Sequence, residues 1–353
     1  MSCCAGCFGD RGLRKSIIPL RSSVVGSCSF CASENAPILD PKSLAEYFEF
    51  LVSAYQPDLN GKFLVQLFRD DWGMFDHPRM DDSRARELLG EVLDDRDVVR
   101  RTFSPIGVHD ADRVNEWETL RNELMYRNRF FPNVDIDLER LELLLSRLIP
   151  ESDETPGLWY RARIQLGETV FPATEMGAPP RRTASHGRAN PAGVPYLYLA
   201  STQEAAVSEV RPHTGEIACV AEFRTNTDLM LVDLRGPRRM VSPFLLEDAE
   251  DIARMRSDLP FLERLGEELT RPVVPEAAAI DYAPSQYLCE FIKKCGYDGV
   301  IYRSAVSDGI NLALFDPVQA EPGSVTQYRI ARVLVETAKV DTSSDHGFWR
   351  RRW

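Results

Sequence analysis

The sequence of 353 residues is long enough for two domains, and its 44% hydrophobic and 27% charged residues are typical of a globular protein. Its formal net charge of −12 argues against an unselective grip on nucleic acid or anionic membranes, which need a positive surface. The sequence has neither an apolar run of about eighteen residues nor the apolar stretch of a signal peptide at its start. We therefore expect a cytoplasmic protein whose cysteines are mostly reduced.

The first segment, residues 1–35, is rich in cysteine. Two Cys-x-x-Cys pairs separated by twenty residues stand in it: Cys4/Cys7 and Cys28/Cys31. Each pair can offer two thiolates to one tetrahedral ion, so the spacing predicts a zinc ribbon with a structural Zn²⁺. Cys3 could replace Cys4, although the two-residue spacing favours Cys4. The alternatives are unconnected thiols and a redox Cys-x-x-Cys, which is disfavoured because no βαβ pattern surrounds it.

The second segment, residues 36–155, has apolar residues at helical spacing and is predicted to be an α-helical domain. In DPKSLAEYFEFLVSAY, Asp40 is the expected N-cap and Pro41 the first helical residue. The same logic predicts helices in three more stretches: DDSRARELLGEVLDD, ADRVNEWETLRNELMYRN and DIDLERLELLLSRLI. Such apolar stripes are typical of a packed core, so we interpret this segment as a module for contacts or regulation.

The polar stretch ESDETPG, residues 151–157, predicts a domain boundary, because short strands follow it. The predicted strands are LWYRARI, VPYLYLA, EIACVAEF, DLMLVDL, YDGVIYRS, GINLALFD and QYRIARVLVE. Helices are expected between them at STQEAAVSEV, at about 245–269 and at SQYLCEFIKKCG. Residues 156–340 are therefore predicted to be an α+β domain. The basic aromatic residues 341–353, which end in WRRRW, are expected to form a frayed tail.

The helix STQEAAVSEV carries a carboxylate in an apolar setting. Ser201 is the expected N-cap, and Glu204 three residues later completes a capping box. Glu209 follows small residues that let the helix lie tightly on the sheet, which would place its carboxylate at the edge of a cleft. On this helix alone, a solvated helix face is the simpler interpretation.

The same domain supplies residues suited to a phosphorylated ligand that has a flat ring and a ribose. Arg188 lies in the tight loop HGRANPAG, where arginine suits a bidentate grip on phosphate. Tyrosines such as Tyr198 recur at strand edges and suit either core packing or stacking on a ring. Ser304 ends a strand, where it either stops the strand or places a hydroxyl beside a ligand. No Gly-x-Gly-x-x-Gly or Walker loop indicates redox or phosphoryl-transfer use of such a ligand.

The blocks YRAR, GRANPAGVPYLYLA, AAVSEV and YDGVIYRSA…GINLALFDP, in this order, resemble the RES domain, a family named for its arginine, glutamate and serine. The resemblance covers about residues 157–320, and the start of the chain resembles more loosely the N-terminal module of longer RES proteins. It implies a fold similar to ADP-ribosyltransferase toxins and an activity that consumes NAD⁺. Many RES proteins are bacterial toxins paired with an Xre-type antitoxin.

Residue by residue, the resemblance places the family's three named residues on Arg161, Glu209 and Ser304, with Arg163 as an alternative to Arg161. The residues that it implies for NAD⁺ binding are Arg188, Tyr198, Arg163 and Asn190. Ala189 is a departure, because many short RES toxins carry a tryptophan in this block.

The implied reaction is cleavage of the nicotinamide–ribose bond of NAD⁺ by a glycohydrolase or phosphorylase that acts as a toxin or defence effector. The reaction passes through an oxocarbenium-like state, which a carboxylate such as Glu209 stabilises. Arg161 and Arg188 would hold the pyrophosphate, Tyr198 would contact the nicotinamide side, and Ser304 would orient a ribose or amide group. A protein ADP-ribosyltransferase and a non-catalytic NAD⁺-sensing adaptor are the alternatives. The acceptor, an antitoxin or regulatory partner, and a homo-oligomeric state are left open.

Overall fold

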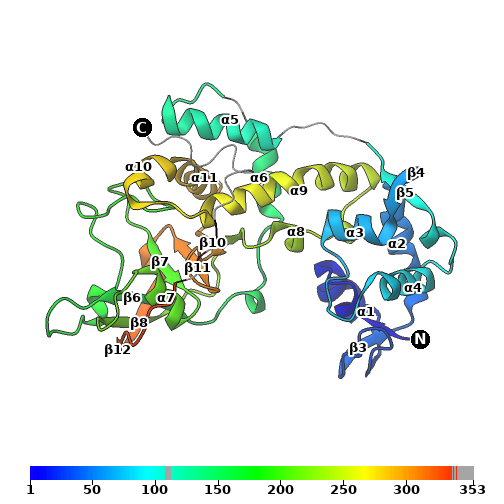
Figure 1. Ribbon diagram of the computed structural model, residues 1–353, viewed down its shortest axis with the longest axis horizontal. Coiled ribbons are helices and arrows are strands. Elements are labelled where there is room, and N and C mark those ends of the chain that lie inside the picture. Colours follow the sequence, from blue (N-terminus) through cyan, green and yellow to red (C-terminus); the bar gives the residue numbers. More distant parts are fainter. Residues whose placement is uncertain (108–112, 135, 336, 338, 340–353) are drawn as a thin grey trace.

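The chain folds into a mixed α+β structure, which a computed structural model describes for residues 1–107, 113–134, 136–335, 337 and 339. The predicted tail, residues 341–353, lies outside the described residues. A seven-stranded sheet and an N-terminal part stand at opposite ends of the molecule, and helix α9 (Ala249–Thr270) runs between them (Figure 1). No helix within the described ranges is long and apolar enough to cross a membrane.

The first segment forms a small antiparallel sheet, a 3₁₀ turn at Ala5–Cys7 and a π-helical stretch at Leu13–Ile17 that continues into a short α-helix. Its strands follow the order β1-β3-β2. The bounds are β1 Cys3–Cys4, α1 Ile18–Arg21, β2 Val24–Gly26 and β3 Ala36–Leu39. The pairing of β1 with β3 and of β2 with β3 brings the two ends of the cysteine-rich segment together.

The second segment contains the predicted helices and the predicted cap. The Asp40 side chain accepts a hydrogen bond from the Lys42 N–H, and Pro41 begins a short 3₁₀ turn that leads into α2. The helices are α2 Ala45–Val52, α3 Leu64–Trp72, α4 Asp82–Val92, α5 Arg113–Tyr126 and α6 Leu138–Ser146. The N-cap prediction at Asp40 is therefore confirmed.

Two strands in this segment, β4 (Tyr55–Phe63) and β5 (Thr102–Pro105), were not predicted from the helical pattern. They pair antiparallel, with a register shift between Pro57 and Lys62. Gly61 is required there, because a Cβ at this position would collide with the backbone of Phe103. A proline, a bulge and a glycine hide the alternation that marks a strand.

The large sheet has the strand order β12-β8-β6-β7-β11-β10-β9, and of its paired strands only β9 and β10 run parallel within the described residues. Its strands are β6 Trp159–Ile164, β7 Leu197–Ala200, β8 Ile217–Thr225, β9 Leu231–Asp233, β10 Gly299–Arg303, β11 Ile310–Leu314 and β12 Ala320–Arg329. The last strand was predicted at residues 327–336, whereas β12 spans Ala320–Arg329, so the prediction overlaps only its end. Strand β12 ends at the Arg329–Ile217 pair, because its partner β8 begins there.

Helices from this half of the chain pack beside the sheet and against the second segment. They are α7 Gln203–Glu209, α8 Pro237–Met240, α9, α10 Ala278–Asp281 and α11 Ala283–Lys294. Both α9 and α11 contact α5. The predicted helix at about 245–269 is confirmed as α9, whose N-cap Asp248 accepts from the Asp251 N–H.

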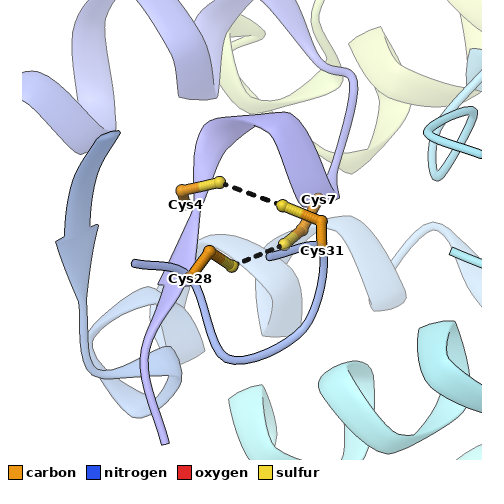
Figure 2. A group of neighbouring side chains, drawn as sticks. All are labelled: Cys4, Cys7, Cys28 and Cys31. Carbon is orange, nitrogen blue, oxygen red and sulfur yellow. Dashed lines mark hydrogen bonds between the residues drawn. The ribbon is translucent and has the colours of Figure 1, made fainter. Parts of the chain in front are cut away.

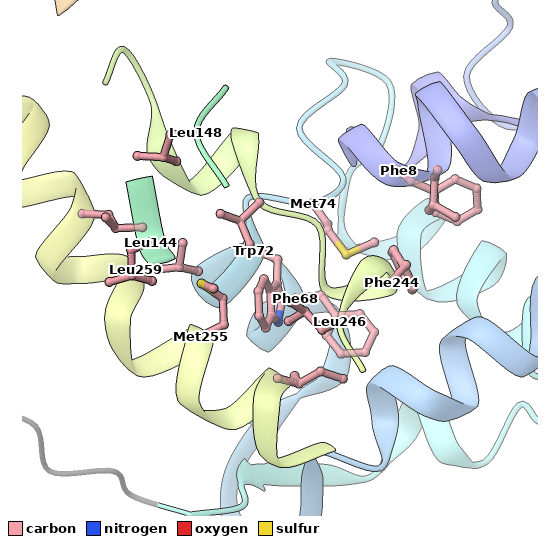
Figure 3. Packing of buried hydrophobic residues seen from close by; sticks show 14 of the residues in the cluster. Phe8, Phe68, Trp72, Met74, Leu144, Leu148, Phe244, Leu246, Met255 and Leu259 are labelled. Carbon is pink, nitrogen blue, oxygen red and sulfur yellow. The ribbon is translucent and has the colours of Figure 1, made fainter. Parts of the chain in front are cut away.

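One hydrophobic core runs through both halves of the chain. Phe8 and Phe68 of the N-terminal segments belong to the same buried cluster as Phe244 and Met255 (Figure 3), and Phe48 is also a member of this cluster. Two smaller clusters lie on the sheet, one around Trp159 and β7, the other between β6 and α7. The packing is therefore continuous across the polar stretch 151–157.

Asp10 is a buried carboxylate at this junction, and it gives the fold a pH dependence. Its Oδ1 accepts hydrogen bonds from the Leu13 N–H (2.8 Å) and the Ser242 hydroxyl (2.9 Å). Burial raises the pKa of Asp10 to about 6, and these bonds offset part of the effect. An unfolded aspartate has a pKa of about 3.9. The protonated carboxyl is thus favoured in the folded chain, and this contribution is lost as the pH rises from about 4 to about 6.

We expect Asp10→Asn to raise the free energy of unfolding by about 1–2 kcal/mol at pH 8, and by progressively less toward pH 4. The amide keeps the acceptor oxygen and removes the buried charge. Urea denaturation across this pH range measures the effect, with Asp228→Asn as an exposed control. A lower stability of Asp10→Asn at pH 8 would contradict the account.

Candidate functional site

A cavity of about 290 Å³ lies between the sheet and helix α7. Four of the predicted site residues line it: Arg161, Arg188, Tyr198 and Glu209. Its remaining lining comes from β6, β7, β11, the 187–188 loop and three tyrosines: Tyr160, Tyr282 and Tyr302. The cavity therefore brings together Arg161 and Glu209, which lie far apart in the sequence, whereas Ser304 is not among the residues that line it.

Helix α7 delivers Glu209 to this cavity as its last residue. The prediction of Ser201 as N-cap was wrong, because the side chain of Thr202 accepts the hydrogen bond from the Ala205 N–H. The Ser201 hydroxyl instead accepts from the Ile310 N–H at the start of β11 (3.1 Å). A Cβ on Gly309 would lie 2.5 Å from the Cβ of Ala205, so the loop before β11 can approach the helix only with glycine there.

The Glu209 carboxylate is held by two donors, one from the residue directly after β10 and one from β11. The Ser304 hydroxyl donates to Glu209 Oε1 at 2.7 Å, and the Asn311 Nδ2 donates to the same oxygen at 2.7 Å. No hydrogen bond reaches Oε2 from the part of the chain that the structure describes. Two charge-assisted bonds on one oxygen fix the carboxylate and leave the other oxygen for a ligand.

Arg161 lies where β6 and β7 separate. The two strands share a single residue pair, Tyr160 with Ala200, and beyond it the Arg161 Nη1 donates to the Tyr198 carbonyl at 2.9 Å. Burial and, to a smaller extent, the nearby Arg163 lower the pKa of Arg161 to about 10. Arg161 is still a cation at neutral pH. Its Nε is buried without a partner among the described residues, as is the Oδ1 of Asn311.

Tyr198 and Asn190 shape the loop that carries Arg188. The Tyr198 hydroxyl donates to the Asn190 Oδ1 at 2.6 Å and accepts from the Ala189 N–H at 3.0 Å. Three loop carbonyls accept from the Asn190 Nδ2: those of Ser185, Pro191 and Val194. A Cβ on Gly187 would lie 2.5 Å from the Tyr198 hydroxyl oxygen, so this loop requires glycine. Asn190 holds the loop and is not among the residues that line the cavity.

Arg188 reaches the cavity from this loop. Its Nη1 donates to the Arg271 carbonyl at 2.6 Å, and its guanidinium lies 5.4 Å from the ring centre of Tyr282. The Ser285 hydroxyl donates to the Arg188 carbonyl at 2.6 Å. Both ends of Arg188 are therefore fixed by residues from the 271–285 region.

Arg163 lies apart from this constellation. Its Nη2 donates to the Gly177 carbonyl at 2.8 Å, and its guanidinium is 6.0 Å from the ring centre of Phe171. Of the two arginines that the motif left open, Arg161 lines the cavity and Arg163 does not.

The sequence analysis missed Asn311, although a signal was present. Asn311 is the polar residue of the otherwise apolar strand INLALF, and it is buried with its Nδ2 on Glu209. Polar residues inside apolar strands need partners, so they often mark a site. Tyr302 lies on the adjacent strand β10, and burial raises its pKa well above the ordinary value, which keeps its hydroxyl neutral.

The four predicted cysteines form a second candidate site at the N-terminal end of the molecule (Figure 2). Their sulfur atoms all lie within 4.8 Å of one another, and all four residues are buried. The sulfur atoms of Cys4 and Cys31 are 3.5 Å apart, and those of Cys7 and Cys28 are 3.3 Å apart. The interaction with Cys28 raises the pKa of Cys4 to about 11. Hydrogen bonds from Cys4 and Cys7 lower the pKa of Cys28. The cluster can hold one metal ion.

The structure is thus a mixed α+β fold in which a carboxylate and two arginines line one cavity. A family model described as the RES domain matches residues 158–333, so the chain belongs to the RES domain family through this region. The family that the sequence motifs predicted is confirmed. No curated protein matches the chain.

One solved structure with a similar chain is described as "Crystal structure of the M.tuberculosis MbcT-MbcA toxin-antitoxin complex". The two chains are 17% identical, the match covers 55% of this chain and 94% of that chain, and the TM-score is 0.32.

Asn190→Ala should destabilise the protein, because it removes the hydrogen bonds that hold the 185–194 loop and leaves three part-buried carbonyls without this donor. We expect a loss of about 2–3 kcal/mol in the free energy of unfolding, measured by urea denaturation. Asn226→Ala, at an exposed position, is the matched control. Equal stabilities of the two variants would show that Asn190 does not hold this loop.

Proposed function

We propose that the protein cleaves the bond between nicotinamide and ribose in NAD⁺, with Glu209 as the catalytic carboxylate. The observation that carries this proposal is the geometry of Glu209, held by Ser304 and Asn311 in a cavity lined by Arg161 and Arg188. Membership of the RES domain family also supports the proposal, because the matched region, residues 158–333, contains these residues.

The reaction needs a negative charge on the protein beside the ribose, and its leaving group needs no proton. As the glycosidic bond breaks, its electron pair leaves with nicotinamide, which departs as a neutral base. Positive charge develops on the ribose C1′ and ring oxygen, as in glycoside hydrolysis. The Glu209 carboxylate stabilises this charge, and the Ser304 and Asn311 donors keep it in place during the reaction. The acceptor then bonds to C1′ and releases a proton.

The cationic residues suit the other part of the substrate. A cavity of about 290 Å³ stands at the lower end of the usual range for ligand pockets, about 300–1,000 Å³. We infer that it takes the nicotinamide–ribose end and that the adenosine end extends outward. Arg161 and Arg188 then hold the pyrophosphate, while Tyr198 contacts the nicotinamide side.

The biological role that we propose is that of a toxin or defence effector. It rests on the family alone, in which depletion of NAD⁺ is the damaging activity. An antitoxin or regulatory protein is the corresponding partner.

Purified full-length protein is expected to release nicotinamide from NAD⁺. Glu209→Gln should lower kcat by about 100-fold or more, because the amide lacks the charge that stabilises the transition state. Glu204→Gln, at an exposed position on the same helix, is the matched control and should leave the rate unchanged.

Product analysis by mass, with and without inorganic phosphate, separates the reaction types. Free ADP-ribose indicates a glycohydrolase, a phosphate ester of ADP-ribose indicates a phosphorylase, and ADP-ribose on a protein band indicates a transferase. No nicotinamide release under either condition contradicts the proposal, and tight NAD⁺ binding without turnover would instead identify a sensing adaptor.

We further propose that the cysteine cluster binds a structural Zn²⁺. Zinc prefers four thiolates at about 2.3 Å in a tetrahedron, which sets sulfur–sulfur distances of about 3.8 Å, within the range of the cluster. The ion would hold the two Cys-x-x-Cys loops together, and its closed shell leaves no position for a substrate.

Purified protein should contain one zinc per chain, measured by elemental analysis. Cys28→Ser is expected to lose the metal and to lower the melting temperature, because metal binding contributes to folding. Cys3→Ser is the matched control, since Cys3 is buried beside the cluster without belonging to it. Zinc that persists in Cys28→Ser and disappears in Cys3→Ser would overturn the ligand set.

A further inference from the structure

Helix α9 carries a buried glutamate, Glu268, on which several cations converge. Its side chain is 1% exposed. The Arg121 Nε donates to Oε1 at 3.2 Å, and the Arg264 Nη1 lies 3.0 Å from Oε2. The Trp117 Nε1 donates to Oε2 at 3.5 Å. Both oxygens are therefore bound from α5, a helix of the N-terminal half of the chain.

The same glutamate stands one turn before the residue that holds Arg188. Arg271 is the C-cap residue that directly follows α9, and its Nη1 lies 3.8 Å from the Glu268 Oε1. The Arg271 carbonyl accepts the 2.6 Å hydrogen bond from the Arg188 Nη1. A continuous series of contacts thus leads from α5 through Glu268 and the end of α9 to an arginine of the ligand cavity.

We propose that Glu268 is a positioning residue for substrate binding, which acts by fixing the end of α9 so that the Arg271 carbonyl orients Arg188. This inference rests on the proposed function. It gives α5 a specific part in the site, namely to bind the carboxylate that sets the position of a substrate-binding arginine. Losing the Glu268 charge frees Arg121 and Arg264, shifts the last turn of α9, and displaces the Arg188 guanidinium from the pyrophosphate.

The chain contains a matched control on the same helix. Asp258 is buried in α9, with a side chain 2% exposed, and pairs with Arg140 (2.6 Å) and Arg113 (3.1 Å) of the N-terminal half. Asp258→Asn thus breaks a similar buried ion cluster between the same two parts of the molecule. No contact of Asp258 leads to Arg188 within the described residues, so its loss should affect stability alone.

The experiment compares steady-state kinetics of NAD⁺ cleavage by full-length wild type, Glu268→Gln, Asp258→Asn and Arg188→Ala, alone and in combination. Glu268→Gln is expected to raise KM about fivefold with kcat nearly unchanged, since Arg188 holds a part of the substrate remote from the reacting bond. Asp258→Asn should lower the melting temperature similarly and leave KM at the wild-type value. In the Arg188→Ala background, Glu268→Gln should raise KM no further, because both changes remove the same interaction.

An unchanged KM in Glu268→Gln overturns the inference, as does a KM effect that multiplies with that of Arg188→Ala. An equal rise of KM in Asp258→Asn also overturns it, because it would indicate general loosening. If Glu268→Gln fails to fold, Arg121→Lys replaces it, with a smaller rise in KM expected in the same direction. If the wild-type protein does not turn over NAD⁺, the proposed function itself is contradicted. If the wild-type protein is active but KM behaves in one of the ways just described, only the role of Glu268 is contradicted.

Discussion

The hydrogen bonds from Ser304 and Asn311 to a single oxygen of Glu209 are the interaction on which the site depends. They join the last residue of α7 to the residue after β10 and to strand β11, and so tie a partly exposed carboxylate to the sheet. Ala205 and Gly309 make this possible, because only small residues allow the helix and the loop before β11 to come so close. A carboxylate fixed in this way needs little reorganisation when positive charge develops beside it.

The N-terminal half of the chain packs against the helix that leads to this site, α9. Its aromatic residues share a core with α9 and the 237–246 region, and its arginines neutralise the two buried carboxylates of α9. Buried ion clusters contribute little net stability, but breaking one is costly, so they act mainly as devices that fix one arrangement of the helices. The arrangement fixed here presents the end of α9 to the Arg188 loop.

Much of the site could be predicted from the sequence, because its residues stand in short local patterns. The cap at Asp40, the strand-to-helix unit that leads to Glu209 and the Cys-x-x-Cys pairs all have spacing that local geometry dictates. Strand β4 could not be predicted, because Pro57 and a bulge interrupt its alternation. The choice between Arg161 and Arg163 needed the sheet, since both are on the same strand and only the separation of β6 from β7 distinguishes them. The role of Glu268 could not be predicted, because its partners on α5, Trp117 and Arg121, are distant in the sequence.

The most direct test of the central claim is the crystal structure of Glu209→Gln with NAD⁺. The isosteric amide should stop turnover and keep the Ser304 contact, so that the intact substrate remains bound. We predict the nicotinamide ribose in the cavity between α7 and β7, with its C1′ beside residue 209 and the pyrophosphate on Arg161 and Arg188. A dinucleotide bound elsewhere on the molecule, or with its ribose turned away from residue 209, would contradict the account.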